Sequence, residues 1–164
     1  ETGAFAAADL VVIGPGPGDP RDLAQPKIAN YHQAVGDVLS SGQPFLAVCL
    51  GHQVLCEQLG LPVGYKDIVF QGTQAEVTLD QGAERVGFYN TFVGRAPDSG
   101  LPDGVQVCRD EATGDIHMVA GEHYRGIQFH AESILSEDGY ALLQRLIVSL
   151  LDDAAQRGSR AVRP

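Results

Sequence analysis

The sequence predicts an α/β protein whose open, mostly parallel sheet is flanked by helices. Short apolar runs at residues 10–13 and 45–48 have the length of buried strands, and each is followed by apolar residues at helical spacing. Strand–helix–strand–helix order is typical of βαβ units, whose strands pair in parallel. A length of 164 residues suits one domain. We take this domain to span residues 1–153.

The elements of the first half are bounded by glycine and proline. The strand at 10–13 ends at the glycine-rich turn Gly14–Gly18, of sequence Gly-Pro-Gly-Pro-Gly. The next helix has apolar residues at helical spacing and is stopped by Gly42 and Pro44. Its apolar positions are Ile28, Tyr31, Val35 and Val38. A second helix is predicted from just after Gly51 to Gly60.

The second half has a different pattern. Residues 73–79 alternate apolar and polar side chains, which predicts a half-buried strand and a small antiparallel region. Further short strands are expected at 87–93, 105–108, 116–120 and 124–130. One apolar stripe predicts a C-terminal helix through Leu151. Because this pattern stops at Asp152, we expect a flexible tail over residues 154–164, with solvated arginines at 157, 160 and 163.

Charge and composition exclude several classes of partner. The formal net charge is -10, with 11 Lys and Arg against 21 Asp and Glu. Nucleic acid and anionic membranes are therefore not expected partners, because both are bound by clustered basic residues. Apolar runs are far shorter than the roughly 18 residues of a membrane span. Three cysteines without a Cys-x-x-Cys pair predict no disulfide framework and favour a reducing cytoplasm.

Cys49 is the candidate nucleophile. It lies between a buried strand and a helix with Gly51 two residues later, which is the pattern of a nucleophile elbow. A thiol at a helix N-terminus lies near the positive end of the helix dipole, which favours the thiolate. The backbone N–H of Leu50 is placed to donate to an oxyanion. Cys56 and Cys108 fit the alternative of small core residues, and the elbow alone leaves that alternative open for Cys49.

His130 is the candidate base, with Glu132 two residues later. Attack by cysteine needs a group that takes the thiol proton and later gives it to the leaving amine. An imidazole performs this exchange near neutral pH, and a carboxylate on its other nitrogen fixes the tautomer. In a regular strand both side chains would face one way, so the carboxylate reaches the ring only if the strand ends here. A metal site made of His123, His130 and Glu132 is the alternative, although no second cluster supports it. No metal is predicted.

Three segments together resemble the triad class of glutamine amidotransferases. That family carries a Pro-Gly-Pro-Gly turn, a Gly-x-Cys-Leu-Gly-x-Gln elbow and a Gly-x-Gln-Phe-His-Pro-Glu-Ser segment. All three occur here in the family's order, between positions 14 and 133. The resemblance is strongest to the chorismate-utilising branch, which comprises anthranilate synthase and its relatives. It implies the flavodoxin-like glutaminase fold.

The resemblance also implies roles for individual residues. Cys49 would be the nucleophile, His130 the general base and acid, and Glu132 the residue that orients His130. The residues that would bind glutamine or its oxyanion are Gly16, Pro17, Gly18, Leu50, Gln53, Thr91 and Phe92. Thr91 and Phe92 are equally compatible with a half-buried strand.

The resemblance further implies a reaction and a partner. L-glutamine would be hydrolysed to glutamate and ammonia, and a chorismate-utilising synthase, fused or separate, would receive the ammonia. The segments at 14–20 and 85–91 most resemble phenazine-type synthases, which make 2-amino-2-desoxyisochorismate, with anthranilate synthase as the close rival. No cofactor is expected in this domain, whereas the synthase domain is expected to need Mg²⁺.

The sequence departs from the family pattern at three places. Ala47 stands where glycine is usual, and Ala131 where proline is usual; both are small and are expected to preserve the geometry. The family also opens with a further strand and helix, whereas about nine residues precede the glycine-rich turn here. We therefore expect the N-terminal part of the domain to be missing.

Three alternatives remain open from the sequence. The chain could be a non-catalytic regulatory or interaction module of a synthase, the glutaminase of another amidotransferase, or a cysteine peptidase or related hydrolase built on the same elbow. Gln53 and the rigid glycine-rich turn favour a small amino-acid substrate.

Overall fold

The computed structural model describes residues 5, 7–80 and 82–161. The strands of the main sheet are β1 (Val11–Ile13), β2 (Phe45–Val48), β5 (Gln106–Arg109), β6 (Ile116–Ala120) and β7 (Tyr124–Ile127). The remaining elements are α1 (Pro26–Ser41), α2 (Leu50–Gln58), β3 (Val63–Leu79), β4 (Gly82–Gly94) and α3 (Gly139–Ala161).

The main sheet is open and mostly parallel, as predicted. Its order is β1-β2-β7-β6-β5. Strands β1, β2 and β7 pair in parallel, and β6 pairs antiparallel with both β7 and β5. Of the five strands, β6 is therefore the one that runs against the others. The C-terminal ends of β2 and β7 lie side by side, which is where an open α/β sheet places its ligands.

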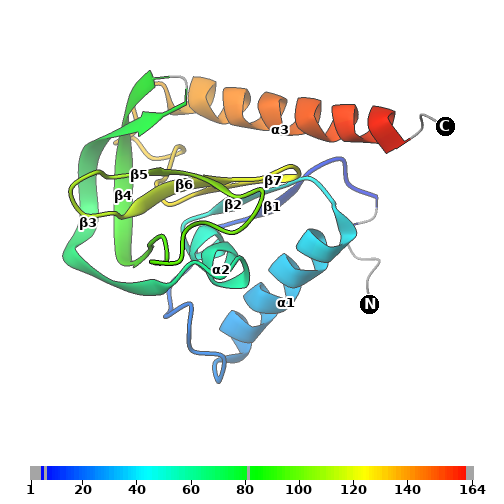
Figure 1. Cartoon of the computed structure of the whole chain (residues 1–164). Helices are drawn as coiled ribbons and strands as arrows, with labels where there is room; N and C mark the ends of the chain where they lie inside the picture. Colours follow the sequence, from blue (N-terminus) through cyan, green and yellow to red (C-terminus); the bar gives the residue numbers. More distant parts are fainter. Residues whose placement is uncertain (1–4, 6, 81, 162–164) are drawn as a thin grey trace.

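Helices cover both faces of this sheet (Figure 1). Alternate residues of β2 point to opposite faces because side chains alternate along a strand. Phe45 and Ala47 belong to a core cluster with residues of α1 and α2. Leu46 and Val48 belong to a second cluster with Leu142 and Leu146 of α3. The sheet is thus the middle of three layers, and the buried strands read as continuous apolar runs for this reason.

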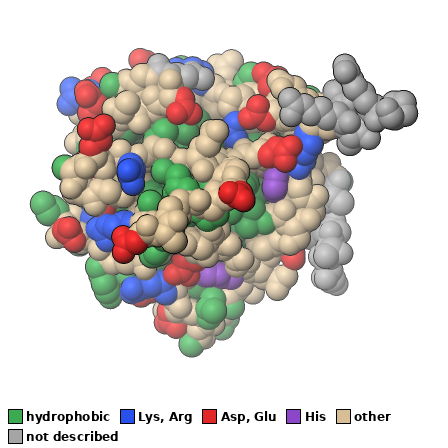
Figure 2. Space-filling model, viewed as in Figure 1, with side chains coloured by type: hydrophobic (Ala, Val, Ile, Leu, Met, Phe, Trp, Pro, Cys, Tyr) green, Lys and Arg blue, Asp and Glu red, His purple; other side chains and the backbone are tan. Residues whose placement is uncertain are grey.

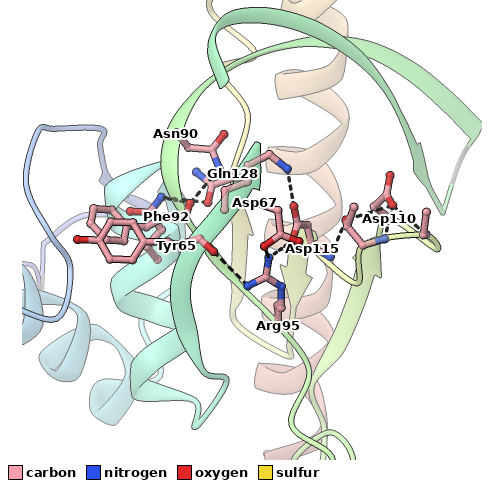
Figure 3. A network of polar contacts seen from close by, with 12 residues as sticks. Tyr65, Asp67, Asn90, Phe92, Arg95, Asp110, Asp115 and Gln128 are labelled. Atoms are coloured by element: carbon pink, nitrogen blue, oxygen red, sulfur yellow. Dashed lines mark hydrogen bonds and ion pairs between the residues drawn. The ribbon is translucent and has the colours of Figure 1, made fainter. Parts of the chain in front are cut away.

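Strands β3 and β4 form a separate antiparallel hairpin beside the main sheet (Figure 1). β3 begins ten residues before the predicted start at Thr73. Register shifts between Tyr65 and Phe70, and again between Gln71 and Thr73, break the alternation that sequence patterns depend on. The base of the hairpin is tied to the main sheet by Asp115, which pairs with Lys66 and, at 2.9 Å, with Arg95 (Figure 3).

Three predicted boundaries are corrected. α2 begins at Leu50, directly after Cys49, rather than after Gly51. β7 ends at Ile127, whereas the apolar pattern extended the strand to His130. α3 continues to Ala161, so residues 154–161 are helical rather than a tail, and residues 162–164 lie outside the described part.

The extension of α3 has a tertiary cause. The Arg157 guanidinium donates a hydrogen bond to the carbonyl oxygen of Gly42, the residue that ends α1 in a left-handed conformation. This contact gives the last turns of α3 a partner even though they lack an apolar stripe. Arg157 is therefore not the solvated charge that the sequence predicted.

One face of the molecule shows how its surface charges are distributed. Acidic and basic side chains are interspersed on the face shown in Figure 2. Among the described residues, no helix combines the length and the apolar character needed to cross a membrane.

Candidate active site

A cavity of about 470 Å³ lies at the C-terminal ends of β2 and β7. It brings together eight of the ten residues proposed from the sequence as catalytic or substrate-binding. The lining residues are Pro15, Gly16, Pro17, Gly18, Cys49, Gln53, Gln71, Tyr89, Asn90, Thr91, Phe92 and His130. The other two are not among the lining residues: Leu50 directly follows Cys49 in the chain, and Glu132 is in contact with His130.

Cys49 occupies a strained elbow between β2 and α2. Its φ of 53° and ψ of -103° are unusual for a residue with a side chain. The conformation is held from both sides, because Cys49 N–H donates to Ile127 O at 2.8 Å and Cys49 O accepts from Gln53 N–H at 2.9 Å. Such strain is stored at functional sites when the surrounding structure enforces it.

The close packing of the elbow explains Gly51. A Cβ at this position would lie 2.4 Å from the carbonyl oxygen of Ile13 in β1, a distance that no side chain tolerates. The glycine therefore lets α2 start directly against the sheet and places Cys49 at the cavity.

Burial outweighs the helix dipole at the Cys49 thiol. The residue is 6% exposed, and burial raises the pKa of the thiol to about 11. The Leu50 N–H lowers this pKa by hydrogen bonding to the sulfur, and the Glu132 carboxylate raises it. The sequence predicted a stabilised thiolate, whereas the structure indicates a protonated thiol at neutral pH. Attack by Cys49 thus requires a base.

His130 and Glu132 are in contact after the end of β7. His130 Nδ1 lies 2.7 Å from Glu132 Oε1. Because a carboxylate can only accept, Nδ1 carries the proton, and in the neutral imidazole Nε2 is then the nitrogen with the lone pair. Nε2 is buried and has no hydrogen-bond partner among the described residues. The early end of the strand produces this geometry, since a turn rather than a strand separates the two residues.

The position of His130 is set by β4 and by Ser136. His130 N–H donates to Gly87 O at 2.8 Å, and Ser136 Oγ donates to His130 O at 2.6 Å while accepting from Gly87 N–H at 3.0 Å. The Tyr89 ring packs against the imidazole in a T-shaped arrangement, with ring centroids 5.2 Å apart. Sequence reasoning missed Gly87, Tyr89 and Ser136 in this role, because their contact with His130 is made across the fold.

The glycine-rich turn is anchored by α1. Lys27 Nζ donates to Pro17 O at 3.0 Å, and Tyr31 Oη donates to Pro15 O at 3.1 Å. A Cβ at Gly16 would lie 2.8 Å from Lys27 Nζ, so a side chain there would displace this anchor. Lys27 and Tyr31 were missed as well; the sequence marked Tyr31 only as an apolar helix position.

One wall of the cavity is a cluster of carboxamides around the carbonyl of Phe92. Gln53 Nε2 and Asn90 Nδ2 each donate to Phe92 O at 2.9 Å. Gln53 also reaches the buried Gln128. Asn90 and Gln128 were not proposed from the sequence as site residues, although Gln128 lies inside the motif that contains His130.

The alternative of a metal site finds no support in the geometry. His123 precedes β7 and its carbonyl accepts from Phe45 N–H, so it lies at the opposite end of the sheet from His130. Within the ranges that the structure describes, no group of three or more His, Cys, Asp or Glu residues is arranged to hold a metal ion.

Fold and site together define a class: an α/β protein with a cysteine elbow at the C-terminal edge of a parallel sheet, facing a histidine that is paired with a carboxylate. The chain belongs to the class-I glutamine amidotransferase family, whose model matches residues 2–150.

Relatives refine the placement within the family. The chain is 46% identical over 154 residues to the phenazine-specific anthranilate synthases of Pseudomonas chlororaphis and Pseudomonas fluorescens, covering 92% of this chain and 24% of theirs. It is 31% identical to anthranilate synthase component 2 of Archaeoglobus fulgidus, covering 85% of this chain and 74% of that protein. The chain thus spans about a quarter of the length of the Pseudomonas relatives.

Solved structures support the fold. A protein of Thermoplasma acidophilum described as a putative GMP synthase component aligns with a TM-score of 0.73 at 13% identity, covering 99% of this chain and 80% of that one. A glutamine amidotransferase of Thermotoga maritima aligns with a TM-score of 0.64 at 21% identity, covering 92% and 65%.

Proposed function

We propose that this chain is a glutaminase in which Cys49, His130 and Glu132 form the catalytic triad, and that its ammonia is used by a chorismate-aminating synthase. The observation that carries the proposal is that Cys49 and His130 line one cavity while the far nitrogen of His130 is bonded to Glu132. The free Nε2 is the only ring atom left to take the Cys49 proton.

The first half-reaction forms a thioester. His130 Nε2 takes the thiol proton, and the sulfur attacks the side-chain amide carbon of glutamine. The resulting oxyanion accepts the Leu50 N–H, with the glycine-rich turn supplying the second donor. When the C–N bond breaks, His130 returns its proton to the leaving nitrogen and ammonia departs.

The second half-reaction hydrolyses the thioester. His130 takes a proton from water, the hydroxide attacks the acyl carbon, and the C–S bond breaks to give glutamate. The proton on His130 then restores the Cys49 thiol. Glu132 holds the imidazole in one tautomer throughout and stabilises its cationic form.

The relatives support the proposed partner. Proteins named as anthranilate synthases, including phenazine-specific ones, match most of this chain. We infer that ammonia passes to a chorismate-utilising synthase, fused or separate, which makes 2-amino-2-desoxyisochorismate or anthranilate. The proposed chemistry uses no cofactor in this domain, and the expected Mg²⁺ belongs to the synthase. We place the reaction in the cytoplasm, where the free thiol of Cys49 stays reduced.

The test is covalent capture of the nucleophile. The purified chain is treated with the chloromethyl ketone of L-glutamine, in which a chloromethyl group replaces the amide nitrogen, and the modified residue is located by mass spectrometry. We expect alkylation at Cys49 that excess L-glutamine prevents, while Cys56, which is fully buried and does not line the cavity, stays free. Absence of labelling at Cys49, or labelling that glutamine does not prevent, would contradict the proposal.

A further inference from the structure

We propose that Gln128 is a positioning residue that directs the carboxamide oxygen of Gln53 into the cavity, where it accepts a hydrogen bond from the α-ammonium group of the substrate. This inference rests on the proposed glutaminase function. It concerns a residue that does not react and that acts only through Gln53.

The starting point is the hydrogen bonding of Gln53. Its Nε2 donates to Phe92 O at 2.9 Å and to Gln128 Oε1 at 3.1 Å. A primary amide has two N–H donors and one carbonyl acceptor, so both donors are used inside the protein. Because Gln53 lines the cavity, Oε1 is the polar atom left to face a ligand there.

The backbone carbonyl of Phe92 determines the direction of every amide in this cluster. A carbonyl can only accept, so Gln53 and Asn90 must both present their NH₂ groups to it. The second N–H of Gln53 then requires an acceptor, which is Gln128 Oε1 (Figure 3). The hydrogen bonds of the cluster therefore fit one orientation of the three amides, and Gln128 supplies the last acceptor.

Gln128 is placed to connect the parts of the site. It is fully buried, it follows β7 directly, and its backbone N–H donates to His117 O at 2.9 Å in β6. Its side chain reaches Gln53 on α2, one turn after the nucleophile, and it precedes His130 by two residues. The elbow helix and the His130 segment are thereby linked through one hydrogen bond between side chains.

The cluster also includes buried polar atoms that lack hydrogen-bond partners within the described part of the chain, which is unfavourable for stability. Gln128 Nε2 and Asn90 Oδ1 are buried without hydrogen-bond partners among the described residues. An unpaired buried polar atom is unfavourable, and an apolar side chain at position 128 would avoid it. A requirement for the acceptor Oε1 explains why an amide is present.

The chemistry at the cavity follows from this remaining acceptor, Gln53 Oε1. A carboxamide oxygen attracts an ammonium group and not a carboxylate. L-glutamine carries one cation, its α-ammonium group, so Gln53 Oε1 would bind that group. The site would therefore favour substrates with a free α-amino group over amides that lack one. Loss of the Gln128 acceptor leaves one Gln53 N–H unpaired and leaves the bond to Phe92 O as the one that holds the amide. With one bond in place of two, the amide plane is free to turn about that bond and Oε1 is no longer held toward the substrate.

The experiment compares two reagents on the purified chain. Alkylation of Cys49 is followed with the chloromethyl ketone of L-glutamine and with the same ketone lacking the α-amino group. In both, the sulfur displaces chloride, so the ratio of the two rates isolates recognition of the α-amino group. Wild type is expected to prefer the amino-acid reagent.

Variants at position 128 then test the inference. In Gln128→Leu we expect the preference to fall about tenfold, consistent with a lost buried hydrogen bond, while the rate with the reagent lacking the amino group stays within about twofold. Gln128→Glu retains an acceptor and is expected to keep most of the preference. Gln128→Asn, whose amide is too short to reach Gln53, replaces the Leu variant if that one does not fold. Gln33→Leu, the same change at an exposed glutamine on α1, is the matched control.

Two outcomes would overturn the inference. An unchanged preference in both Gln128→Leu and Gln128→Asn would show that Gln53 does not depend on Gln128. A parallel fall with both reagents would show a general structural role. If wild-type Cys49 reacts with neither reagent, the proposed glutaminase function fails instead, so the two failures are distinguishable.

Discussion

Two cysteines lie at the elbow, Cys49 just before α2 and Cys56 within it, and they differ in access to the cavity and in the histidine available to each. Cys49 precedes α2, lines the cavity and shares it with His130, whose other nitrogen is bonded to Glu132. Cys56 lies inside α2, fully buried, with its sulfur 3.6 Å from His52 Nε2.

The Cys56–His52 pair shows why proximity of a thiol and an imidazole is not sufficient. Burial raises the pKa of the Cys56 thiol and lowers that of His52 to about 4. Such an imidazole holds a proton too weakly to act as base near neutral pH. Within the described part of the chain, its Nδ1 has no hydrogen-bond partner, so no carboxylate supports it there. Access for a substrate, a carboxylate partner and a backbone donor distinguish Cys49.

The largest expected effect is on activity. Cys49→Ala is expected to lower glutamine hydrolysis roughly 10⁴-fold or more, because the covalent route is lost. Cys56→Ala is expected to remain within about threefold of wild type. Glutamate release is measured for both, together with ammonia-dependent product formation by the synthase, which both variants should retain. Normal hydrolysis by Cys49→Ala would refute the mechanism.

The carboxylate partner is tested next. Glu132→Gln removes the charge that fixes and stabilises the His130 imidazole, so kcat for glutaminase activity is expected to fall roughly 10³-fold. Glu137→Gln is the control, because Glu137 is a similarly exposed neighbour that pairs with Arg85 instead. Equal activities of the two variants would remove the main distinction between His130 and His52.

The buried pair predicts a pH dependence of stability. The unfolded chain protonates His52 near its ordinary pKa of 6.5, whereas the folded chain does so only at about 4. The unfolded state therefore binds more protons in this window, and the free energy of unfolding falls as the pH drops from 6.5 towards 4, by about 3 kcal/mol for this residue.

Urea denaturation across this pH range measures that effect. His52→Leu is expected to flatten the dependence, leaving the smaller part due to His117 and His123, whose pKa values burial also lowers. The control Val54→Ala shortens a buried side chain of the same helix that carries no titratable group, and it should keep the full slope. A variant His52→Leu with the wild-type slope would contradict the assignment.

The smallest expected effect is on stability, where substitution by glycine is expected to act in opposite directions at the two cysteines. Cys49→Gly relieves a positive φ of 53° and is expected to raise the free energy of unfolding by about 1 kcal/mol while abolishing activity. Cys56→Gly places glycine inside a helix and removes a buried side chain, so it is expected to lower that energy by about 2 kcal/mol. Thermal unfolding of both variants checks the signs; destabilisation by Cys49→Gly would mean that the elbow is not strained.

Much of the sheet was predictable because buried parallel strands are local features. The runs at 45–48 and 116–120 coincide with β2 and β6, and Gly42 ends α1 as predicted. The bounds of β3 and β7 were not predictable from the pattern. Bulges in β3 break the alternation, and apolar residues continue beyond β7 because the segment stays buried after its strand pairing ends.

The candidate site also has a part that was predictable from short segments and a part that was not. Cys49, His130 and Glu132 were proposed from short motifs, because the elbow and the His-x-Glu pair are each encoded within a few residues. Anchors such as Lys27 on the glycine-rich turn, and Ser136 on His130, are hydrogen bonds between segments that a linear pattern does not connect.

By itself, then, the sequence determined the fold class and the family and singled out the candidate catalytic residues, because periodicity, turn residues and motif spacing are features of short segments. The tertiary structure alone decided the environment of those residues. It raises the pKa of the Cys49 thiol, places His52 against the buried Cys56, and joins Gln53 to Gln128 by a hydrogen bond. Burial and hydrogen bonding depend on which segments meet in space, and Gln53 and Gln128 meet across 75 positions of the chain.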